Sequence, residues 1–317
     1  MSTHGEPNPT TRLDDADVLV PGSVPIPVRD YPGSPHECPP VVLLHGAGGN
    51  LLAWSRVIPL LPMRALAVDL RGHGRSGDGP WSFDAVLGDL EAVVAHFGLE
   101  RPVMVGHSLG GMLAALWARR HPDCPAAISF DGHRAAVTSP EHYAGMPPER
   151  VHEDLDRLRA VFDAQAASMA HPLTEQEAAR LTAERAAPSD TVARLQAEVI
   201  ARNLELRGDL WWLRPDAATS GALRRSPEFN DCLPVFREVT SPLLVVVATR
   251  DFEGIPAEFR DLMAAFRAGL RRDLARLATE RSNITIREVD AGHDMVATQP
   301  EVVANIVCEF LTGSLPV

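Results

Sequence analysis

Residues 103–110, VMVGHSLG, decide the fold of this chain. A short apolar run typical of a buried strand leads directly into the pattern G-x-S-x-G, and a helical pattern follows at once. The turn from strand to helix at such a serine is sharp, so it needs small neighbours that do not strike the strand or the helix. This turn lifts the Ser108 hydroxyl above the sheet, which makes Ser108 the candidate nucleophile.

Similar apolar runs recur along the chain, and helical patterns separate them. Short β-branched runs that are apolar throughout are typical of strands buried on both faces of a parallel sheet. We predict such strands at 41–44, 65–69, 103–105, 127–130, 243–247 and 284–289, edge strands at 17–20 and 24–28, and helices at 51–61, 83–97, 109–121, 256–280 and 300–311. The alternation predicts an α/β fold with a mostly parallel sheet and right-handed crossovers.

One segment interrupts this alternation. From 134 to 240 the sequence shows helical patterns at 148–170, 174–186 and 189–207, a Trp-containing piece around Trp211, and no convincing strand. A structureless loop of this length is improbable, so the segment is interpreted as a helical insertion. We therefore expect a core formed by 1–133 and 241–317, with an inserted helical domain at 134–240, which we call the insertion.

A serine hydroxyl needs a base to become a nucleophile, and the base needs an acid to orient it. His293 follows directly after the last predicted strand and is the candidate base. Asp251 follows the 243–247 strand and gives the chain order Ser, Asp, His, so it is the expected acid. Asp131, which also ends a strand, is the alternative acid.

The remaining candidate residues surround this trio. Attack on a carbonyl creates an oxyanion, which backbone N–H groups must stabilise. The expected donors are the N–H groups of Leu109 and of Ala47, which lies in the glycine-rich stretch HGAGGN at 45–50. We further expect four side chains to contact the substrate: His133, Trp211, Trp212 and Met295.

Four segments of the chain carry a family resemblance: HGAG at 45–48, DLRGHGRS at 69–76, GHSLGG at 106–111 and GHD at 292–294. In order and spacing they resemble the α/β-hydrolase fold superfamily from about residue 41 to the end, except in the insertion. The resemblance implies an eight-stranded core flanked by helices, a helical cap inserted after the sixth strand, and a Ser-His-Asp triad. Epoxide hydrolases and haloalkane dehalogenases of the family carry aspartate where this chain has Ser108.

Composition excludes several other chemistries. All 30 basic residues are arginine, so Schiff-base lysines, lysine-anchored pyridoxal phosphate and the P-loop lysine are absent. The formal charge of −12 disfavours nucleic acid and membrane surfaces as partners. Four scattered cysteines suggest neither disulfides nor a zinc site, and we expect no cofactor and no metal. The first 15 residues lack the apolar stretch of a signal peptide, which favours a cytoplasmic protein.

We therefore expect a serine hydrolase that cleaves a carboxylic ester of a small to medium, largely apolar substrate through an acyl-enzyme. Because the same triad serves them all, lactonase action on a bulky lactone, thioesterase, C–C hydrolase and perhydrolase chemistry remain open. From a different class, a ligand-binding sensor on a hydrolase scaffold also remains open. The sequence leaves open whether the protein is a monomer or a homodimer.

Overall fold

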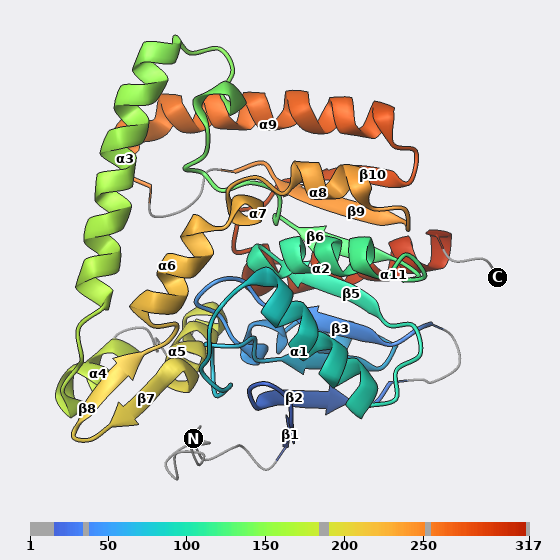
Figure 1. Cartoon of the computed structure of the whole chain (residues 1–317), viewed down its shortest axis with the longest axis vertical. Coiled ribbons are helices and arrows are strands. Elements are labelled where there is room, and N and C mark those ends of the chain that lie inside the picture. Colours follow the sequence, from blue (N-terminus) through green and yellow to red (C-terminus); the bar gives the residue numbers. More distant parts are fainter. Residues whose placement is uncertain (1–15, 34–37, 184–189, 251–254, 315–317) are drawn as a thin grey trace, which may run out of the picture.

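The computed structural model describes residues 16–33, 38–183, 190–250 and 255–314. Their centre is an eight-stranded sheet in the order β1-β2-β4-β3-β5-β6-β9-β10 (Figure 1). The strands from β4 to β10 pair in parallel, while β1 and β2 pair antiparallel at one edge. The strands are β1 Asp17–Val20, β2 Ile26–Tyr31, β3 Val41–Leu44, β4 Ala65–Val68, β5 Val103–His107, β6 Ala127–Phe130, β9 Leu243–Ala248 and β10 Ile284–Val289. The predicted α/β fold with a mostly parallel sheet is confirmed.

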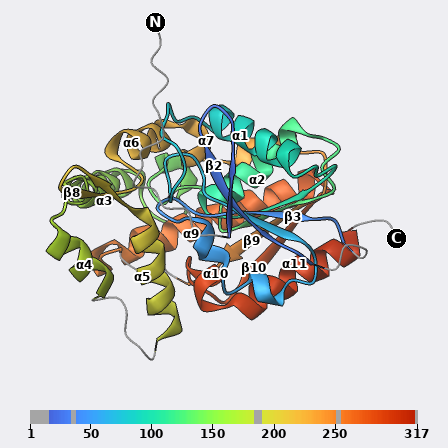
Figure 2. The same ribbon diagram turned by 90° about the horizontal axis from the view of Figure 1, so that it is seen from below.

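The sheet is covered by helices on both faces because its strands are apolar throughout. On β3, Val42 and Leu44 pack into one core, whereas Val41 and Leu43 pack into the other. The first core is completed by α1 Phe83–His96, α2 Leu109–Arg120 and α9 Arg260–Glu280, and the second by α10 Met295–Thr298 and α11 Pro300–Ser314. Figure 2 shows α1 and α2 on one side of the strands and α11 on the other.

One segment predicted as an α-helix has a different secondary structure. The segment 51–61 forms two short 3₁₀ helices, η1 Leu51–Trp54 and η2 Ile58–Leu60, instead of one α-helix. Pro59 lies in the first turn of η2. Because proline has no N–H and its ring clashes with the preceding turn, an α-helix from residue 51 cannot continue through it.

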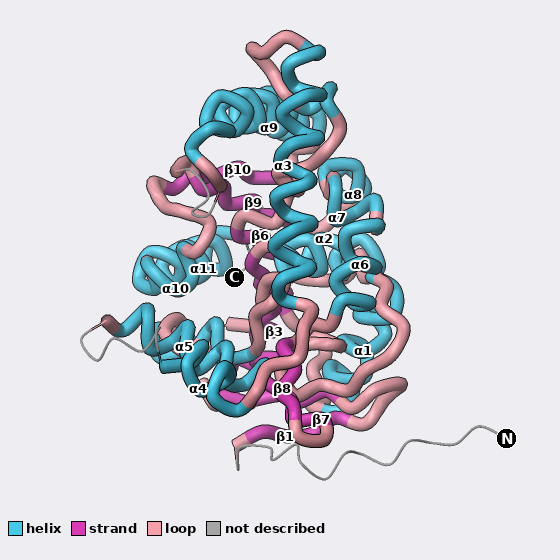
Figure 3. The backbone as a smooth tube through the Cα atoms, turned by 90° about the vertical axis from the view of Figure 1, so that its left-hand side faces the viewer, coloured by secondary structure: helices cyan, strands magenta, loops and turns pink. Residues whose placement is uncertain are grey.

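The residues between β6 and β9 form η3 Pro140–His142, α3 Pro148–Met169, α4 Glu175–Ala183, α5 Thr191–Asn203, β7 Leu204–Arg207, β8 Leu210–Leu213, α6 Ala217–Arg225, α7 Pro227–Asn230 and α8 Leu233–Glu238. The long helix α3 runs from α9 towards α4 and the β7–β8 hairpin (Figures 1 and 3). The end of the insertion belongs to the layer that covers the sheet, since α8 packs on α2 and α9.

The hairpin corrects the expectation of an insertion without strands. Residues 204–207, predicted as the end of a helix, instead pair with β8 in an antiparallel ladder. Gly208 begins the two-residue turn with a φ of +63°, a conformation that glycine adopts without steric cost. Among the described residues, no helix combines the length and the apolar character needed to cross a bilayer.

Candidate active site

Ser108 lies in a sharp turn between β5 and α2. Its φ of 54° and ψ of −118° are unusual for a residue with a side chain. Close packing explains the glycines around it: a Cβ at Gly106 would lie 1.9 Å from the Gly110 oxygen, and one at Gly110 would lie 2.1 Å from the Leu44 oxygen. The serine itself is half-buried.

Asp131 and His293 meet beside this turn. The Nδ1–H of His293 donates to Oδ2 of Asp131 over 2.6 Å, although the two residues are 162 positions apart. Asp131 follows β6 with a φ of 52°, a left-handed conformation that aspartate tolerates better than most residues. The next residue packs on the serine turn, because a Cβ at Gly132 would lie 2.2 Å from the Ser108 oxygen. The residue after Asp131 is thus packed directly against the Ser108 backbone.

Three donors meet the Asp131 carboxylate. Besides His293, the Ala248 N–H donates to Oδ1 over 3.0 Å, and Nε2 of His133 donates to the same oxygen over 2.9 Å. The Nδ1 of His133 accepts the Arg134 N–H, which assigns the proton of a neutral ring to Nε2. Burial alone would raise the pKa of Asp131, but the charge interactions and hydrogen bonds of His133 and His293 outweigh it and hold this pKa far below its usual range. The carboxylate therefore stays ionised at neutral pH.

His107 connects the serine turn to His293. Its Nε2–H donates to the His293 carbonyl over 2.6 Å, and the two ring centroids lie 4.7 Å apart. Desolvation, together with the nearby His293, lowers the pKa of His107 to about 3. His107 is therefore a neutral group that fixes the backbone of His293 beside Ser108.

The expected acid, Asp251, lies outside the described residues. The carboxylate that the structure brings to His293 is that of the alternative, Asp131. The sequence offered a signal for it, since Asp131 follows a strand of the parallel sheet, but the same signal applied to Asp251.

The two expected oxyanion donors flank the serine turn. Leu109 is the first residue of α2, where a backbone N–H has no acceptor within the helix. Ala47 lies in a turn closed by the Gly49 N–H, which donates to the Gly46 oxygen over 3.0 Å. This turn approaches Ser108 closely, because a Cβ at Gly46 would lie 3.1 Å from the Ser108 Cβ. Leu109 thus adjoins Ser108 in the chain, and Ala47 follows a glycine that packs on Ser108.

The four expected substrate contacts have different surroundings. His133 is 5% exposed, and its ring is held by Asp131 and the Arg134 N–H. Met295 is 1% exposed and packs in the second core. Trp211 and Trp212 are half-buried neighbours on β8, and successive strand residues point to opposite faces. The Arg207 guanidinium lies over the Trp212 ring at 5.9 Å.

Sequence reasoning missed a polar junction between the insertion and the core. Arg202 contacts Asp69 at 2.8 Å and Asp17 at 2.7 Å, and all three side chains are at most 2% exposed. Arg214 donates to the Ser76 carbonyl over 2.7 Å and pairs with Asp78. An arginine in a chain with 30 of them gives no signal of burial, because only its tertiary neighbours distinguish it.

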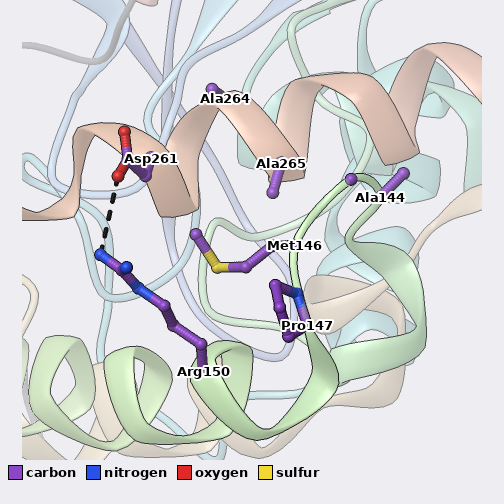
Figure 4. A pocket seen from close by; sticks show the side chains of 8 residues that line it. Ala144, Met146, Pro147, Arg150, Asp261, Ala264 and Ala265 are labelled. Atoms are coloured by element: carbon purple, nitrogen blue, oxygen red, sulfur yellow. Dashed lines mark ion pairs between the residues drawn. The ribbon is translucent and has the colours of Figure 1, made fainter.

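A cavity of about 430 Å³ lies elsewhere, between the start of α3 and α9 (Figure 4). Small and apolar residues line it, and Arg150 pairs with Asp261 across it at 3.6 Å. None of its lining residues is a candidate catalytic residue. Within the described ranges, no three His, Cys, Asp or Glu side chains gather in a group that could hold a metal ion.

The fold and this strand–serine–helix turn define a class of protein, and the sequence matches it: residues 39–252 fit the family model described as alpha/beta hydrolase fold. The chain therefore belongs to the α/β-hydrolase fold family. It is similar to a serine hydrolase-like protein of Danio rerio, with 22% identity over 92% of this chain and 88% of the relative.

Two further similarities are more local or more distant. A pimeloyl-[acyl-carrier protein] methyl ester esterase of Chromobacterium violaceum is 49% identical, but over only 27% of this chain and 33% of that protein. The crystal structure of E-2-(acetamidomethylene)succinate hydrolase superposes with a TM-score of 0.63 at 21% identity, covering 93% of this chain and 98% of that one. At this identity the superposition supports the fold alone.

Proposed function

We propose that the protein is a serine hydrolase that cleaves carboxylic esters of small to medium, largely apolar molecules through an acyl-enzyme. The observation that carries the proposal is the 2.6 Å hydrogen bond between His293 and Asp131 beside the turn that presents Ser108. A buried, ionised carboxylate on Nδ1 of a histidine leaves Nε2 as the atom that accepts a proton. This is the electrostatic requirement for activating a serine.

In the proposed mechanism Ser108 attacks the ester carbonyl while His293 accepts its proton. The tetrahedral oxyanion is stabilised by the N–H groups of Leu109 and Ala47, because preorganised donors cost no reorganisation during the reaction. His293 then returns the proton to the leaving alcohol, which departs and leaves an ester on Ser108. A water molecule, deprotonated by His293, hydrolyses this acyl-enzyme and restores the serine. Asp131 stays ionised and stabilises the imidazolium.

The identity of the nucleophile favours this chemistry over that of some relatives. A segment of 108 residues is 35% identical to epoxide hydrolase B of Mycobacterium tuberculosis, over 30% of that protein. The epoxide hydrolases that this chain resembles carry an aspartate at this turn, whereas this chain has Ser108. The named methyl ester esterase among the relatives supports the ester class.

The decisive test replaces the nucleophile. Ser108→Ala should abolish turnover of a panel of p-nitrophenyl esters, leaving less than about one thousandth of the activity, with the circular dichroism spectrum unchanged. Ser139→Ala is the matched control, since Ser139 is exposed and its side chain makes no cap hydrogen bond, and it should retain full activity. Esterase activity that survives in Ser108→Ala would refute the assignment.

The same panel addresses the chemistries that share this triad. It should include a thioester and a lactone matched in size to the best ester, since the acyl-enzyme mechanism applies to each. An initial burst of alcohol followed by steady turnover is expected of a hydrolase. A ligand that binds rapidly without any turnover would favour the sensor function instead.

A further inference from the structure

Asn203, the last residue of helix α5 in the insertion, lies in the polar junction with the core. Its side chain is 2% exposed, and every polar atom of its amide has a partner in the core. Nδ2 donates to the Gly48 carbonyl over 2.7 Å, and Oδ1 accepts the Gly74 N–H over 2.8 Å and Nδ2 of Asn50 over 3.1 Å. The insertion thereby reaches the glycine-rich loop of residues 45–50.

The Asn203 side chain contacts the exposed part of the 45–50 loop. Ala47 and Gly48 are exposed, so packing on the core does not hold this turn. Gly48 has a φ of +74° and no atom within 4 Å of the position where a Cβ would stand. A hydrogen bond from a buried amide to the Gly48 carbonyl therefore holds the exposed part of a turn whose Gly46 side packs on Ser108.

The far end of the same loop is tied to the same helix. Asn50 is fully buried, and its Nδ2 also donates to the Val199 carbonyl of α5 over 2.7 Å. Its Oδ1 accepts the Leu52 N–H and so begins η1. Both ends of the turn that contains Ala47 are thus bound to α5, one through Asn203 and the other through Asn50.

We propose that Asn203 is a positioning residue for the oxyanion site, so that docking of α5 on the core and the placement of the Ala47 N–H are coupled. The inference rests on the proposed function, in which Ala47 donates to the tetrahedral intermediate. An N–H that stabilises only this intermediate raises kcat without changing ground-state binding. Loss of Asn203 therefore lowers kcat and leaves KM nearly unchanged.

Two substitutions and a control test this. Asn203→Ala removes all three side-chain bonds, whereas Asn203→Asp keeps an acceptor for Gly74 and Asn50 and loses the donor to Gly48. Each should lower kcat on the best ester by about tenfold to a hundredfold, because small misplacements of catalytic groups cost this much, with KM changed less than about threefold. Arg214→Met is the control, since Arg214 anchors the insertion to Gly74, Ser76 and Asp78 but does not touch the loop.

Arg214→Met should lower the melting temperature at least as much as the Asn203 variants while keeping kcat within about twofold. If Arg214→Met lowers kcat equally, or if the Asn203 variants keep kcat, the inference is wrong. Wild-type protein that turns over no ester would instead refute the proposed function, so the two failures are distinguishable.

A measurement on the wild-type protein covers the case in which the Asn203 variants do not fold. A trifluoromethyl ketone forms a tetrahedral adduct on a serine and places its oxygen at the oxyanion donors. Because coupling between two sites is reciprocal, the adduct should slow hydrogen exchange of the α5 amides by about fivefold or more. Unchanged exchange in α5, with protection confined to the loop, would overturn the inference.

Discussion

Asp131 is the residue at which two sequence signals compete. Both Asp131 and Asp251 follow a predicted strand of the parallel sheet in the sequence, and the carboxyl ends of parallel strands lie at the same edge of the sheet. The structure joins Asp131 to His293, holds its other oxygen with His133 and the Ala248 N–H, and packs Gly132 on the serine turn. Among the described residues it is Asp131 that contacts His293, whereas Asp251 lies outside them.

Asp131→Asn removes the charge that stabilises the imidazolium and should lower kcat for esters by about three to four orders of magnitude. Asp251→Asn is the companion variant and should lower kcat by less than about tenfold. Steady-state kinetics at neutral pH measure both. The opposite ranking would make Asp251 the acid and reduce Asp131 to a structural role.

Helix α9 shows how an element depends on its neighbour. Gly269 is buried in the middle of this helix, where glycine weakens a helix relative to alanine. A Cβ there would lie 1.8 Å from the His142 oxygen. The backbone of the segment around η3 therefore rests directly on α9, and the Ala144 N–H donates to the Ala265 carbonyl over 3.0 Å. The glycine is required by this contact between the insertion and the core.

Two glycines within helices, Gly269 and Gly88, should respond differently to replacement by alanine. Gly269→Ala should lower the free energy of unfolding by about 1–3 kcal/mol, the usual cost of overpacking. Gly88→Ala in α1 is the matched control: it is exposed, nothing lies within 4 Å of its Cβ position, and it should raise the free energy of unfolding by about 0.5–1 kcal/mol. Urea unfolding measures both. If both substitutions changed the free energy of unfolding by the same amount, the η3 segment would move away from the added methyl group without cost, and the argument would be wrong.

The β7–β8 hairpin is an element that the local sequence does not predict. The segment 189–207 reads as one helix because LELR at 204–207 continues its pattern with good helix formers. In the structure Leu204 ends the helix with an extended backbone, and the chain turns back through Gly208 to pair with β8. A four-residue strand gains stability only from its partner, so local preference does not reveal it.

At the scale of the whole molecule, buried neutral histidines set the response to acid. Burial is the main cause that lowers the pKa of His45 to about 4 and of His73 to about 3, and neither residue is exposed. In the unfolded chain a histidine titrates near 6.5. Below that pH the unfolded state binds protons that the folded state does not bind, so the free energy of unfolding falls as the pH falls from about 6.5 towards 4.

We expect a loss of roughly 2 kcal/mol per histidine in the free energy of unfolding between pH 7 and pH 5, from these two residues and from His107, whose pKa is likewise lowered to about 3. His73→Asn should remove about a third of this pH dependence. His96→Asn replaces an exposed histidine at the end of α1 and should leave the dependence unchanged. Urea titrations at both pH values give the result. Equal dependence in His73→Asn and the wild type would contradict the argument.

By itself, the sequence determined the sheet, the elbow at Ser108 and the base candidate His293, because apolar periodicity and the glycines of a strained turn are local properties. Only the tertiary structure decided that Asp131 meets His293, that Met295 belongs to the core, and that Asn203 reaches the loop of Ala47. These contacts join residues far apart in the chain. Their hydrogen bonds depend on side-chain positions that no local pattern encodes.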